Sequence, residues 1–542
     1  MRRIESPLVH PFAGFDIPAL VAARAASHPD KPFLVWEPFA GQRASWTFAE
    51  FAHEVDRVAA GLAARDIKAG DSLLVHLDNC PEILFAWFAC AKIGAVCVTT
   101  NARSAADEMT YFADHSGAVA AITQPKFAAM IGGACNDLRW VAVTETDNGE
   151  APAPGSAPGS GPGSGPGGDS FARLAGDPAD APRRPADPMA PLSVQFTSGT
   201  TSRPKAVLWL HGNGLWGAKM NALHEDLRET DCHLTYLPLF HANAQAYSVL
   251  ASLWVGAGCV VQPRFSARRF WDVAIRNGCT WTSMVPFMNR ALMDHDVPRR
   301  HPIRLMGNGI CSPQTDEIFG VKTIGWWGMT ETVSHGFVGD VHLPNRPLSV
   351  GKPAVEYDIR VLNEAGGPVG PDETGDLFIR GVRGISMFAE YLGNEEATAE
   401  AFDDEGFFTT GDKITVHSDG FCSFSDRAKD MLKVGGENVA ASEVERVIAE
   451  QPLAREVAVV AKKHPMLDEV PVAYILVDGG AANAPPDYGE RIVAACRQSL
   501  ADFKVPTEVR LVDDFPRSTI EKIAKNVLRA ELEAERTDDG EG

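Results

Sequence analysis

An alternation of helical and extended periodicity near the N-terminus most constrains the fold of this chain. Between 46 and 100 the apolar pattern predicts an amphipathic helix, a buried strand, a second helix and a second strand. Strands that alternate with helices form parallel sheets with helices on both faces. At 542 residues the chain is also too long for one hydrophobic core. We therefore expect an α/β fold with doubly wound sheets and more than one domain.

Later segments predict two further architectures. Turn-punctuated, strand-rich sequence over 359–424 indicates a β subdomain, and helices alternating with strands after residue 426 indicate a compact α+β domain. We expect a large N-terminal domain over 1–427 and a small, mobile C-terminal domain over 428–542, whose charged tail after Ala530 frays. The Pro-, Gly- and Ser-rich stretch at 148–170 cannot bury apolar surface, so it is expected to be a disordered insertion.

Composition restricts the class of partner. The chain carries 71 acidic and 50 basic side chains, a net charge of −21, which argues against nucleic acid as a partner. Its ten cysteines lack metal-ligand spacing and are interpreted as buried thiols of a reducing compartment. No apolar stretch follows Arg2-Arg3, and the uncharged run at 244–262 contains glycines and polar residues. We expect a cytoplasmic protein without a transmembrane segment, and a homodimer is included among its expected assemblies.

A hydroxyl-rich loop between two apolar strands resembles a phosphate-binding loop. Its candidate phosphate ligands are Thr197, Ser198, Gly199, Thr200, Thr201 and Lys205. Small residues let backbone N–H groups converge on an anion, and the lysine adds a positive charge. Pro204 precedes the lysine and Ala206 follows it, which excludes a Walker motif. A solvent-exposed turn is the alternative interpretation.

Four later segments also suit nucleotide chemistry. Trp327, Thr330 and Glu331 offer an aromatic face for adenine, a hydroxyl for phosphate and a carboxylate for Mg²⁺. Asp412 in Thr-Gly-Asp suits the ribose hydroxyls, and Lys522 lies on a loop that enters a helix. The remaining segment lies at the domain boundary and contains Arg427, Lys429, Lys433, Gly435 and Gly436. Taken singly, a structural explanation is favoured for each: Asp412 as a turn cap, Arg427 and Lys429 as a solvated charged run, and Lys522 as a surface lysine.

In this order the motifs resemble those of the adenylate-forming superfamily of acyl-CoA synthetases, carrier-protein adenylation domains and beetle luciferases. The resemblance covers nearly the whole chain. It implies ATP, Mg²⁺ and coenzyme A as cofactors and co-substrates. It also implies two steps: a carboxylate attacks the α-phosphate of ATP to give acyl-AMP and pyrophosphate, and a thiol then takes the acyl group and releases AMP.

The resemblance also implies a role for each motif. The hydroxyl-rich loop would hold the β- and γ-phosphates, Thr330 and Glu331 would serve phosphate and Mg²⁺, and Asp412 and Arg427 would hold the ribose. Trp327 stands where the family usually has tyrosine, and the segment facing the adenine would be Gly307, Asn308 and Gly309. Lys522 would bridge the carboxylate and the α-phosphate. Lys429 would be the hinge of the small domain, while Lys433, Gly435 and Gly436 would follow it towards the pantetheine path.

The chain departs from the family pattern at three glycines. Ser202 and Ala206 replace glycines of the phosphate loop, and Glu521 replaces the glycine before Lys522. Because a carboxylate beside Lys522 can pair with it, Lys525 is the second candidate for its role.

The acid itself is not identified by the motifs. His241 resembles the residue that gates the carboxylate channel, and a core histidine is the alternative. The expected pocket residues are Asn243, Gln245, Met284, Phe287, Met288, Val333, Ser334 and His335. This polar mixture is unlike a long fatty-acyl tunnel, and the motifs look most like the carnitine/crotonobetaine–CoA ligase branch. Free CoA is the expected acceptor; a ligase that loads a separate carrier protein and a non-catalytic ATP-binding regulator are the alternatives.

Overall fold

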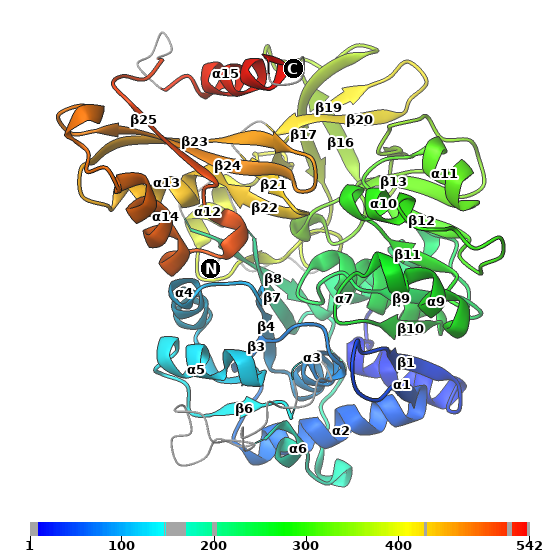
Figure 1. The fold of residues 1–542 in the computed structure, drawn as a ribbon. Helices are drawn as coiled ribbons and strands as arrows, with labels where there is room; N and C mark the ends of the chain where they lie inside the picture. The colour runs from blue at the N-terminus through cyan, green and yellow to red at the C-terminus, as the bar shows by residue number, and fades with distance from the viewer. Residues whose placement is uncertain are drawn as a thin grey trace. The chain divides into compact units, whose positions relative to one another are not determined.

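The computed structural model describes residues 9–145, 147, 170–197, 203–427, 431–516 and 523–538 (Figure 1). The predicted insertion at 148–170 therefore lies almost wholly outside the described residues. The chain divides into two compact units. The first contains Met1–Ala102, Phe112–Phe196 and Ala206–Asp426, and the second contains Arg103–Tyr111, Thr197–Lys205 and Arg427–Gly542.

The first unit contains a nine-stranded sheet, a seven-stranded sheet and a four-stranded sheet. The nine-stranded sheet has the order β15-β14-β13-β12-β11-β9-β10-β1-β2, and the six strands from β13 to β1 in this order run parallel. Its strands are β1 (Pro32–Trp36), β2 (Ala44–Thr47), β9 (Cys232–Thr235), β10 (Gly258–Val261), β11 (Trp281–Ser283), β12 (Leu305–Asn308), β13 (Lys322–Trp327), β14 (Phe337–Val338) and β15 (Lys352–Pro353). The connections between the parallel strands contain helices, as a doubly wound sheet requires.

The seven-stranded sheet confirms the predicted alternation at 46–100. Its order is β18-β8-β7-β4-β3-β5-β6, with β3, β4, β5, β6 and β7 parallel. The strands are β3 (Ser72–His76), β4 (Val96–Thr99), β5 (Ala118–Thr123), β6 (Val141–Val143), β7 (Pro191–Thr197), β8 (Lys205–Leu210) and β18 (Glu390–Tyr391). Helix α2 (Phe48–Ala64) begins at a capping box in which Thr47 and Glu50 exchange hydrogen bonds. The expected parallel α/β fold is therefore observed.

The helices follow the predicted spacing. Those of residues 9–427 are α1 (Ile17–Ser27), α2, α3 (Pro81–Ile93), α4 (Ala106–Ser116), α5 (Pro125–Ala134), α6 (Phe171–Leu174), α7 (His211–His224), α8 (Ala251–Val255), α9 (Ala267–Asn277), α10 (Pro286–Met293), α11 (Pro313–Phe319) and α12 (Glu395–Glu400). A π-helix, η2 (Asn243–Leu250), precedes α8, and short 3₁₀ turns lie at η1 (Pro178–Asp180) and η3 (Thr330–Thr332). The uncharged run at 244–262 is thus a buried helix that leads into strand β10, as expected.

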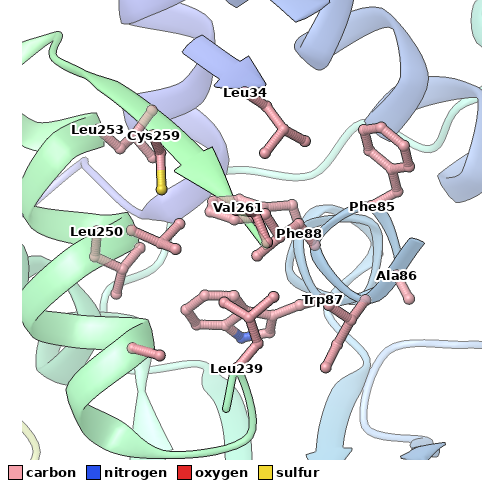
Figure 2. Close-up of a cluster of buried hydrophobic side chains, with 14 of the residues drawn as sticks. Leu34, Phe85, Ala86, Trp87, Phe88, Leu239, Leu250, Leu253, Cys259 and Val261 are labelled. Carbon is pink, nitrogen blue, oxygen red and sulfur yellow. The ribbon is translucent and has the colours of Figure 1, made fainter. Parts of the chain in front are cut away.

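The main core lies where helix α3 meets the nine-stranded sheet (Figure 2). Phe85, Trp87 and Phe88 of α3 are nearly fully buried, and Leu34 of β1 and Val261 of β10 belong to the same cluster. Almost every side chain of α3 is buried, which is the pattern of a helix enclosed on all sides. This helix therefore joins the cores of the two sheets.

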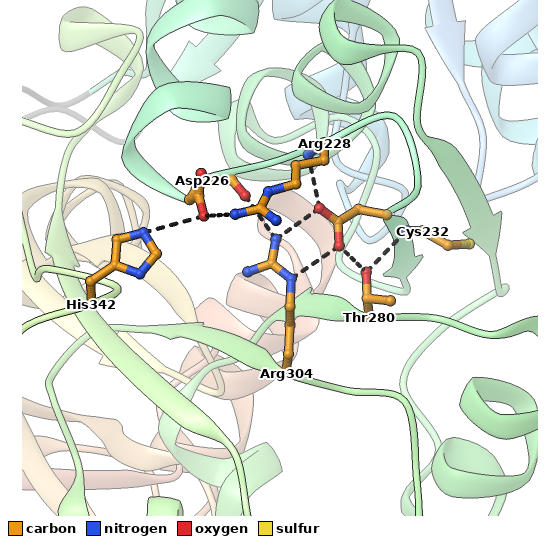
Figure 3. Close-up of polar contacts among 7 residues, drawn as sticks. Asp226, Arg228, Cys232, Thr280, Arg304 and His342 are labelled. Carbon is orange, nitrogen blue, oxygen red and sulfur yellow. Dashed lines mark hydrogen bonds and ion pairs between the residues drawn. The ribbon is translucent and has the colours of Figure 1, made fainter.

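Charged residues hold the edge of the nine-stranded sheet at which its parallel strands begin (Figure 3). Asp231, just before β9, accepts hydrogen bonds from Arg304 Nε at 3.0 Å, Arg304 Nη2 at 2.8 Å and Thr280 Oγ1 at 2.6 Å. Arg304 also donates to the carbonyl of Asp226 at 2.9 Å. Because Asp231 is buried, these bonds tie the beginnings of β9, β11 and β12 together.

The predicted β subdomain is a four-stranded sheet with the order β16-β17-β19-β20. Its strands are β16 (Asp358–Leu362), β17 (Glu373–Arg380), β19 (Phe408–Val416) and β20 (Cys422–Arg427). Strand β17 alternates exposed and buried side chains, so one face of this sheet is apolar.

The second unit contains the predicted α+β elements. Its sheet has the order β22-β21-β24-β23, with β25 paired to β24. Its elements are β21 (Met431–Val434), β22 (Glu437–Ala440), α13 (Ala441–Ala449), β23 (Ala454–His464), β24 (Asp468–Val477), η4 (Ala481–Asn483), α14 (Tyr488–Ser499), η5 (Asp502–Lys504), β25 (Glu508–Val512) and α15 (Lys525–Asp538). The expected fraying after Ala530 is wrong, because α15 continues to Asp538 and buries Leu528 and Leu532 against residues of β23 and β24.

Two further expectations concern the chain as a whole. All ten cysteines are free thiols, and nine are buried. In the parts of the chain that the structure describes, no helix is long and apolar enough to cross a membrane.

Candidate active site

Most of the predicted site residues of the first unit lie where parallel strands of the nine-stranded sheet end. Asn308 ends β12 and Trp327 ends β13, while Met284 directly follows β11 and His241 lies six residues beyond β9. The carboxyl ends of parallel strands meet at one edge of a sheet, and open α/β sheets bind ligands there. The topology therefore brings these predicted residues to the same edge.

The carboxylate of Glu331 is held by an aromatic hydroxyl. Tyr391 Oη donates to Glu331 Oε1 at 2.9 Å, and the Phe388 amide donates to the Glu331 carbonyl at 2.9 Å. Burial raises the pKa of Tyr391, and the negative charge of Glu331 raises it further. Glu331 is 4% exposed, so its position is fixed from both ends.

Glu331 is predicted to serve a magnesium ion that is bound together with a nucleotide, and this role remains a prediction. Among the described residues, no group of three or more histidines, cysteines and carboxylates could hold a metal ion. Mg²⁺ commonly uses only one or two protein carboxylates and takes its other ligands from substrate phosphates and water. Thr330 lies beside Glu331, and its carbonyl accepts a hydrogen bond from Trp209 Nε1 at 2.9 Å.

A long-range hydrogen bond joins the predicted adenine residue to the predicted ribose residue. Trp327 Nε1 donates to Asp412 Oδ2 at 2.8 Å, and both side chains are buried. In β19, the segment from Thr410 to Asp412 forms an irregularity opposite Leu377, and Gly411 has φ of +75°. Such bulges redirect a side chain, which explains how Asp412 turns towards the indole.

The two glycines of the predicted Gly-Asn-Gly segment differ in the space beside them. A Cβ at Gly307 would collide with the Trp326 indole, whereas a Cβ at Gly309 would meet nothing within 4 Å. Asn308 is buried, and its Oδ1 accepts from the Gly309 amide at 2.9 Å. Among the described residues, the position of a Cβ at Gly309 is therefore open, whereas the absence of a side chain at Gly307 is needed for packing.

A strained turn follows Glu331. Val333 has φ of +63° and ψ of −38°, a conformation that is strongly unfavourable for a β-branched residue. The Ser334 amide donates to the Thr332 carbonyl at 2.6 Å, which closes a three-residue γ-turn. Tyr357 Oη donates to the same carbonyl at 2.6 Å, and Ser334 Oγ donates to Asn221 Oδ1 at 2.8 Å. Strain of this kind is concentrated at functional sites.

The predicted pocket residues of η2 differ in their surroundings. Gln245 Nε2 donates to the Leu239 carbonyl at 2.9 Å, and Gln245 Oε1 accepts from Gln195 Nε2 at 2.9 Å. Gln245 is fully buried, so it supports the loop that carries His241. Asn243 is half-buried, and its Oδ1 has no hydrogen-bond partner within the part of the chain that the structure describes. The pocket roles of both residues remain predictions, with Asn243 the better placed.

The remaining pocket candidates are apolar or aromatic. Met284 is buried, and its sulfur accepts from Tyr236 Oη at 2.6 Å. Met288 is also buried, and the side chain of Phe287 lies outside the described residues. His335 is fully buried, and its ring stacks on Trp326 with centroids 4.6 Å apart. Desolvation holds the pKa of His335 well below its usual range, and neighbouring His224 lowers it further.

The hydroxyl-rich loop is described at its two ends. Thr197 ends β7 and Lys205 begins β8, and these strands are neighbours in one sheet. Tyr111 Oη donates to the Pro204 carbonyl at 2.9 Å, and the Arg203 guanidinium lies 5.0 Å from the centroid of the Tyr111 ring. Ser198, Gly199, Thr200 and Thr201 lie outside the described residues.

In the second unit, Gly435 and Gly436 form the turn between β21 and β22 with φ of +58° and +90°. Two successive positive φ angles are typical of a tight hairpin and favour glycine. The exposed Lys433 lies in β21, two residues before Gly435, and its amide donates to the Glu469 carboxylate. Lys525 Nζ pairs with Glu445 Oε1 at 2.6 Å.

The remaining predicted residues cannot be placed. Lys429, Lys522 and the side chain of Arg427 lie outside the described residues.

Some residues of this region were not predicted. Tyr391 and Trp209 hold Glu331 and Thr330, but both are distant in sequence and follow no local motif. Tyr247 lies on the same helix as Asn243 and Gln245, so the predicted helix could have indicated it.

Comparisons with known proteins agree with this arrangement. A family model described as "AMP-binding enzyme" matches residues 21–392, and "AMP-binding enzyme C-terminal domain" matches 443–522. A crotonobetaine/carnitine–CoA ligase of Salmonella arizonae is 32% identical over 517 residues, which is 93% of this chain and 97% of that protein.

Solved structures share the fold. An o-succinylbenzoate CoA synthetase of Bacillus subtilis, bound with a product analogue, matches with a TM-score of 0.79 and 24% identity over 94% of this chain and 98% of its own. A fatty acyl CoA synthetase of Mycobacterium tuberculosis matches with a TM-score of 0.65 and 25% identity, over 96% and 98% of the two chains. The chain therefore belongs to the AMP-binding enzyme family, the adenylate-forming superfamily that its motifs resemble, and its enzyme class is that of the AMP-forming CoA ligases.

Proposed function

We propose that this protein activates a short, polar carboxylic acid with ATP and transfers the acyl group to coenzyme A. The observation that carries the proposal is the bond between Trp327 and Asp412, because it joins an aromatic face and a carboxylate at the edge where parallel strands end. An aromatic face suits a purine, and a carboxylate accepts hydrogen bonds from ribose hydroxyls. A nucleoside is therefore the ligand that this pair suits best.

The first step must overcome electrostatic repulsion. An acid carboxylate approaches the α-phosphate while pyrophosphate leaves, so cations and oriented donors must stabilise the transition state. In our proposal Glu331 would hold Mg²⁺, which would supply positive charge to the phosphates. Thr330 and the loop from Thr197 to Lys205 bind phosphate oxygens. Lys522 then bridges the carboxylate and the α-phosphate.

The second step requires a different arrangement of the small domain. We propose that residues 428–542 turn about Lys429, so that Gly435 and Gly436 approach the pantetheine arm of CoA. A tight glycine hairpin presents backbone without side chains, which would allow a thiol-bearing chain to pass closely. The thiol then attacks the acyl carbonyl, and AMP leaves. Thiol chemistry and ten free cysteines favour the cytoplasm as the place of action.

The nature of the acid follows from its proposed surroundings. Asn243, Ser334 and His335 are polar, and similarity to carnitine and crotonobetaine ligases favours a short acid with a polar or charged group. A screen of pyrophosphate release over short polar, betaine-like, aromatic and medium-chain acids, with and without CoA, tests this assignment. We expect short polar acids to release pyrophosphate most rapidly, and a preference for medium-chain acids would contradict it.

The same screen separates the alternatives for the acceptor. A ligase that loads a carrier protein would release pyrophosphate with the acid but form no thioester with free CoA. A non-catalytic regulator would bind ATP and show no acid-dependent exchange of pyrophosphate into ATP.

A further inference from the structure

Three segments of the first unit meet at Gly328, which directly follows β13 and precedes Thr330 by two residues. A Cβ at this glycine would collide with the Tyr247 hydroxyl, and it would lie 2.9 Å from the Ser334 carbonyl oxygen and 3.5 Å from His335 Cα. The Tyr247 side chain therefore reaches from helix η2 to the backbone of the Gly328–Glu331 segment. No side chain larger than hydrogen fits between them.

Tyr247 belongs to a closed group of rings, the aromatic wall, formed by Tyr247, His335 and Trp326. The centroids of Tyr247 and His335 are 4.2 Å apart, and those of His335 and Trp326 are 4.6 Å apart with an angle of 11° between the planes. Tyr247 and Trp326 are 5.8 Å apart. These separations are those of rings in direct contact, so the wall leaves no space for a chain of atoms between its members.

Neighbouring residues pack against the His335 and Trp326 rings of the aromatic wall. His335 Nδ1 lies 3.2 Å from His224 Nδ1, and His224 Nε2 lies 2.7 Å from Glu356 Oε1. On the other side, the indole of Trp326 fills the position that a side chain at Gly307 would occupy. The three rings are 8% exposed or less. The three rings are therefore packed against described residues on more than one side, and a longer ligand would have to displace one of them.

We propose that Tyr247 is the specificity-determining residue that limits the length of the acid. This inference rests on the proposed function, in which Thr330 and Glu331 serve the phosphates and the metal of the adenylation step. The reacting carboxylate then lies near Thr330, and the acyl chain extends along the backbone that leads back to Gly328. The Tyr247 side chain blocks the path of the acyl chain beyond Gly328. The acids selected are short, and each added methylene beyond the wall would have to displace a packed ring.

Exchange of pyrophosphate into ATP with straight-chain acids of four to ten carbons tests the proposal. The variants are Tyr247→Ala, which removes the ring, and Tyr247→Leu, which shortens it with a smaller loss of packing. Phe319→Ala is the matched control, because it also removes a buried ring but lies on α11 away from Gly328. Thermal unfolding of each variant establishes that it is folded.

The wild-type enzyme should prefer butanoate to octanoate. We expect Tyr247→Ala and Tyr247→Leu to raise kcat/KM for octanoate relative to butanoate by about tenfold or more, the scale of discrimination that a pocket wall provides. Phe319→Ala should leave that ratio unchanged. Folded Tyr247 variants with the wild-type ratio, or a wild-type enzyme that uses octanoate as well as butanoate, would overturn the role of Tyr247 while leaving acid activation intact. Absence of exchange with these acids and also with the short polar and betaine-like acids of the screen would instead refute the proposed function, and the inference with it.

Discussion

Replacement of Val333 should reverse the usual order of stability between alanine and glycine. Val333 is fully buried and occupies a γ-turn with φ of +63°. The hydrogen bonds from Ser334 and Tyr357 to the Thr332 carbonyl hold this turn closed. Any residue with a Cβ remains strained there, whereas glycine does not.

The expected magnitudes follow from burial and strain. Val333→Ala removes two buried methyl groups, a loss of about 2 kcal/mol, and keeps the strain. Val333→Gly removes one carbon more and adds about 0.5–1 kcal/mol of backbone entropy, but it releases about 1–3 kcal/mol of strain. With about 0.8 kcal/mol for the extra carbon, the balance runs from glycine about 1 kcal/mol less stable than alanine to about 2 kcal/mol more stable, and its midpoint favours glycine. At ordinary helical positions glycine is less stable than alanine by about 1 kcal/mol.

Urea unfolding of the paired variants measures this difference, compared at equal m-values. Val273 provides the matched control, because it is also fully buried but lies within helix α9. We expect Val273→Gly to be less stable than Val273→Ala by about 1 kcal/mol. If Val333→Gly falls below Val333→Ala by the same amount as at Val273, the turn is not strained and the reasoning fails.

Three other predictions concern the nucleotide site, the sheet edge and the two half-reactions. Trp327→Phe keeps an aromatic ring but removes the donor to Asp412, so we expect KM for ATP to rise about tenfold. Trp281→Phe should leave KM unchanged, because the buried indole nitrogen of Trp281 has no hydrogen-bond partner among the described residues. Equal KM values in the wild type and both variants would contradict the assignment. Arg304→Met leaves the buried Asp231 without its main partner and should lower the free energy of unfolding by about 2–4 kcal/mol at neutral pH. Burial opposes ionisation of Asp231, but Arg304 and the other donors outweigh burial and lower the pKa of Asp231. The stability lost in Arg304→Met should therefore become smaller below about pH 4, as measured by urea unfolding at a series of pH values. A loss of stability that is independent of pH would argue against this role of Arg304. Lys522→Ala should abolish adenylation but spare thioester formation from supplied acyl-AMP, and Lys429→Pro should do the reverse; equal losses in both half-reactions would refute these roles.

Local periodicity and local motifs are sufficient to predict much of the fold from the sequence. The alternation at 46–100 predicted α2, β3, α3 and β4, because burial on both faces of a parallel strand and on one side of a helix leaves a regular apolar pattern. The ends of parallel strands then brought Asn308, Trp327 and Glu331 to one edge without any further assumption.

The contacts that complete the site could not be predicted in this way. Tyr391 meets Glu331 across 60 residues, and Trp327 meets Asp412 across 85 residues, so no local pattern relates these partners. Valine favours extended structure, so the left-handed turn at Val333 contradicts its own propensity and depends on tertiary contacts. Helix α15 was mistaken for a frayed tail because its charged residues outnumber the two leucines that it buries.

Acid-dependent exchange of labelled pyrophosphate into ATP, followed by addition of CoA, tests the central claim most directly. We expect exchange only when a carboxylic acid and Mg²⁺ are present. Added CoA should then yield an acyl-CoA thioester and AMP in equal amounts. ATP binding without exchange, or exchange without thioester formation on free CoA, would contradict the assignment of this chain as an acyl-CoA ligase.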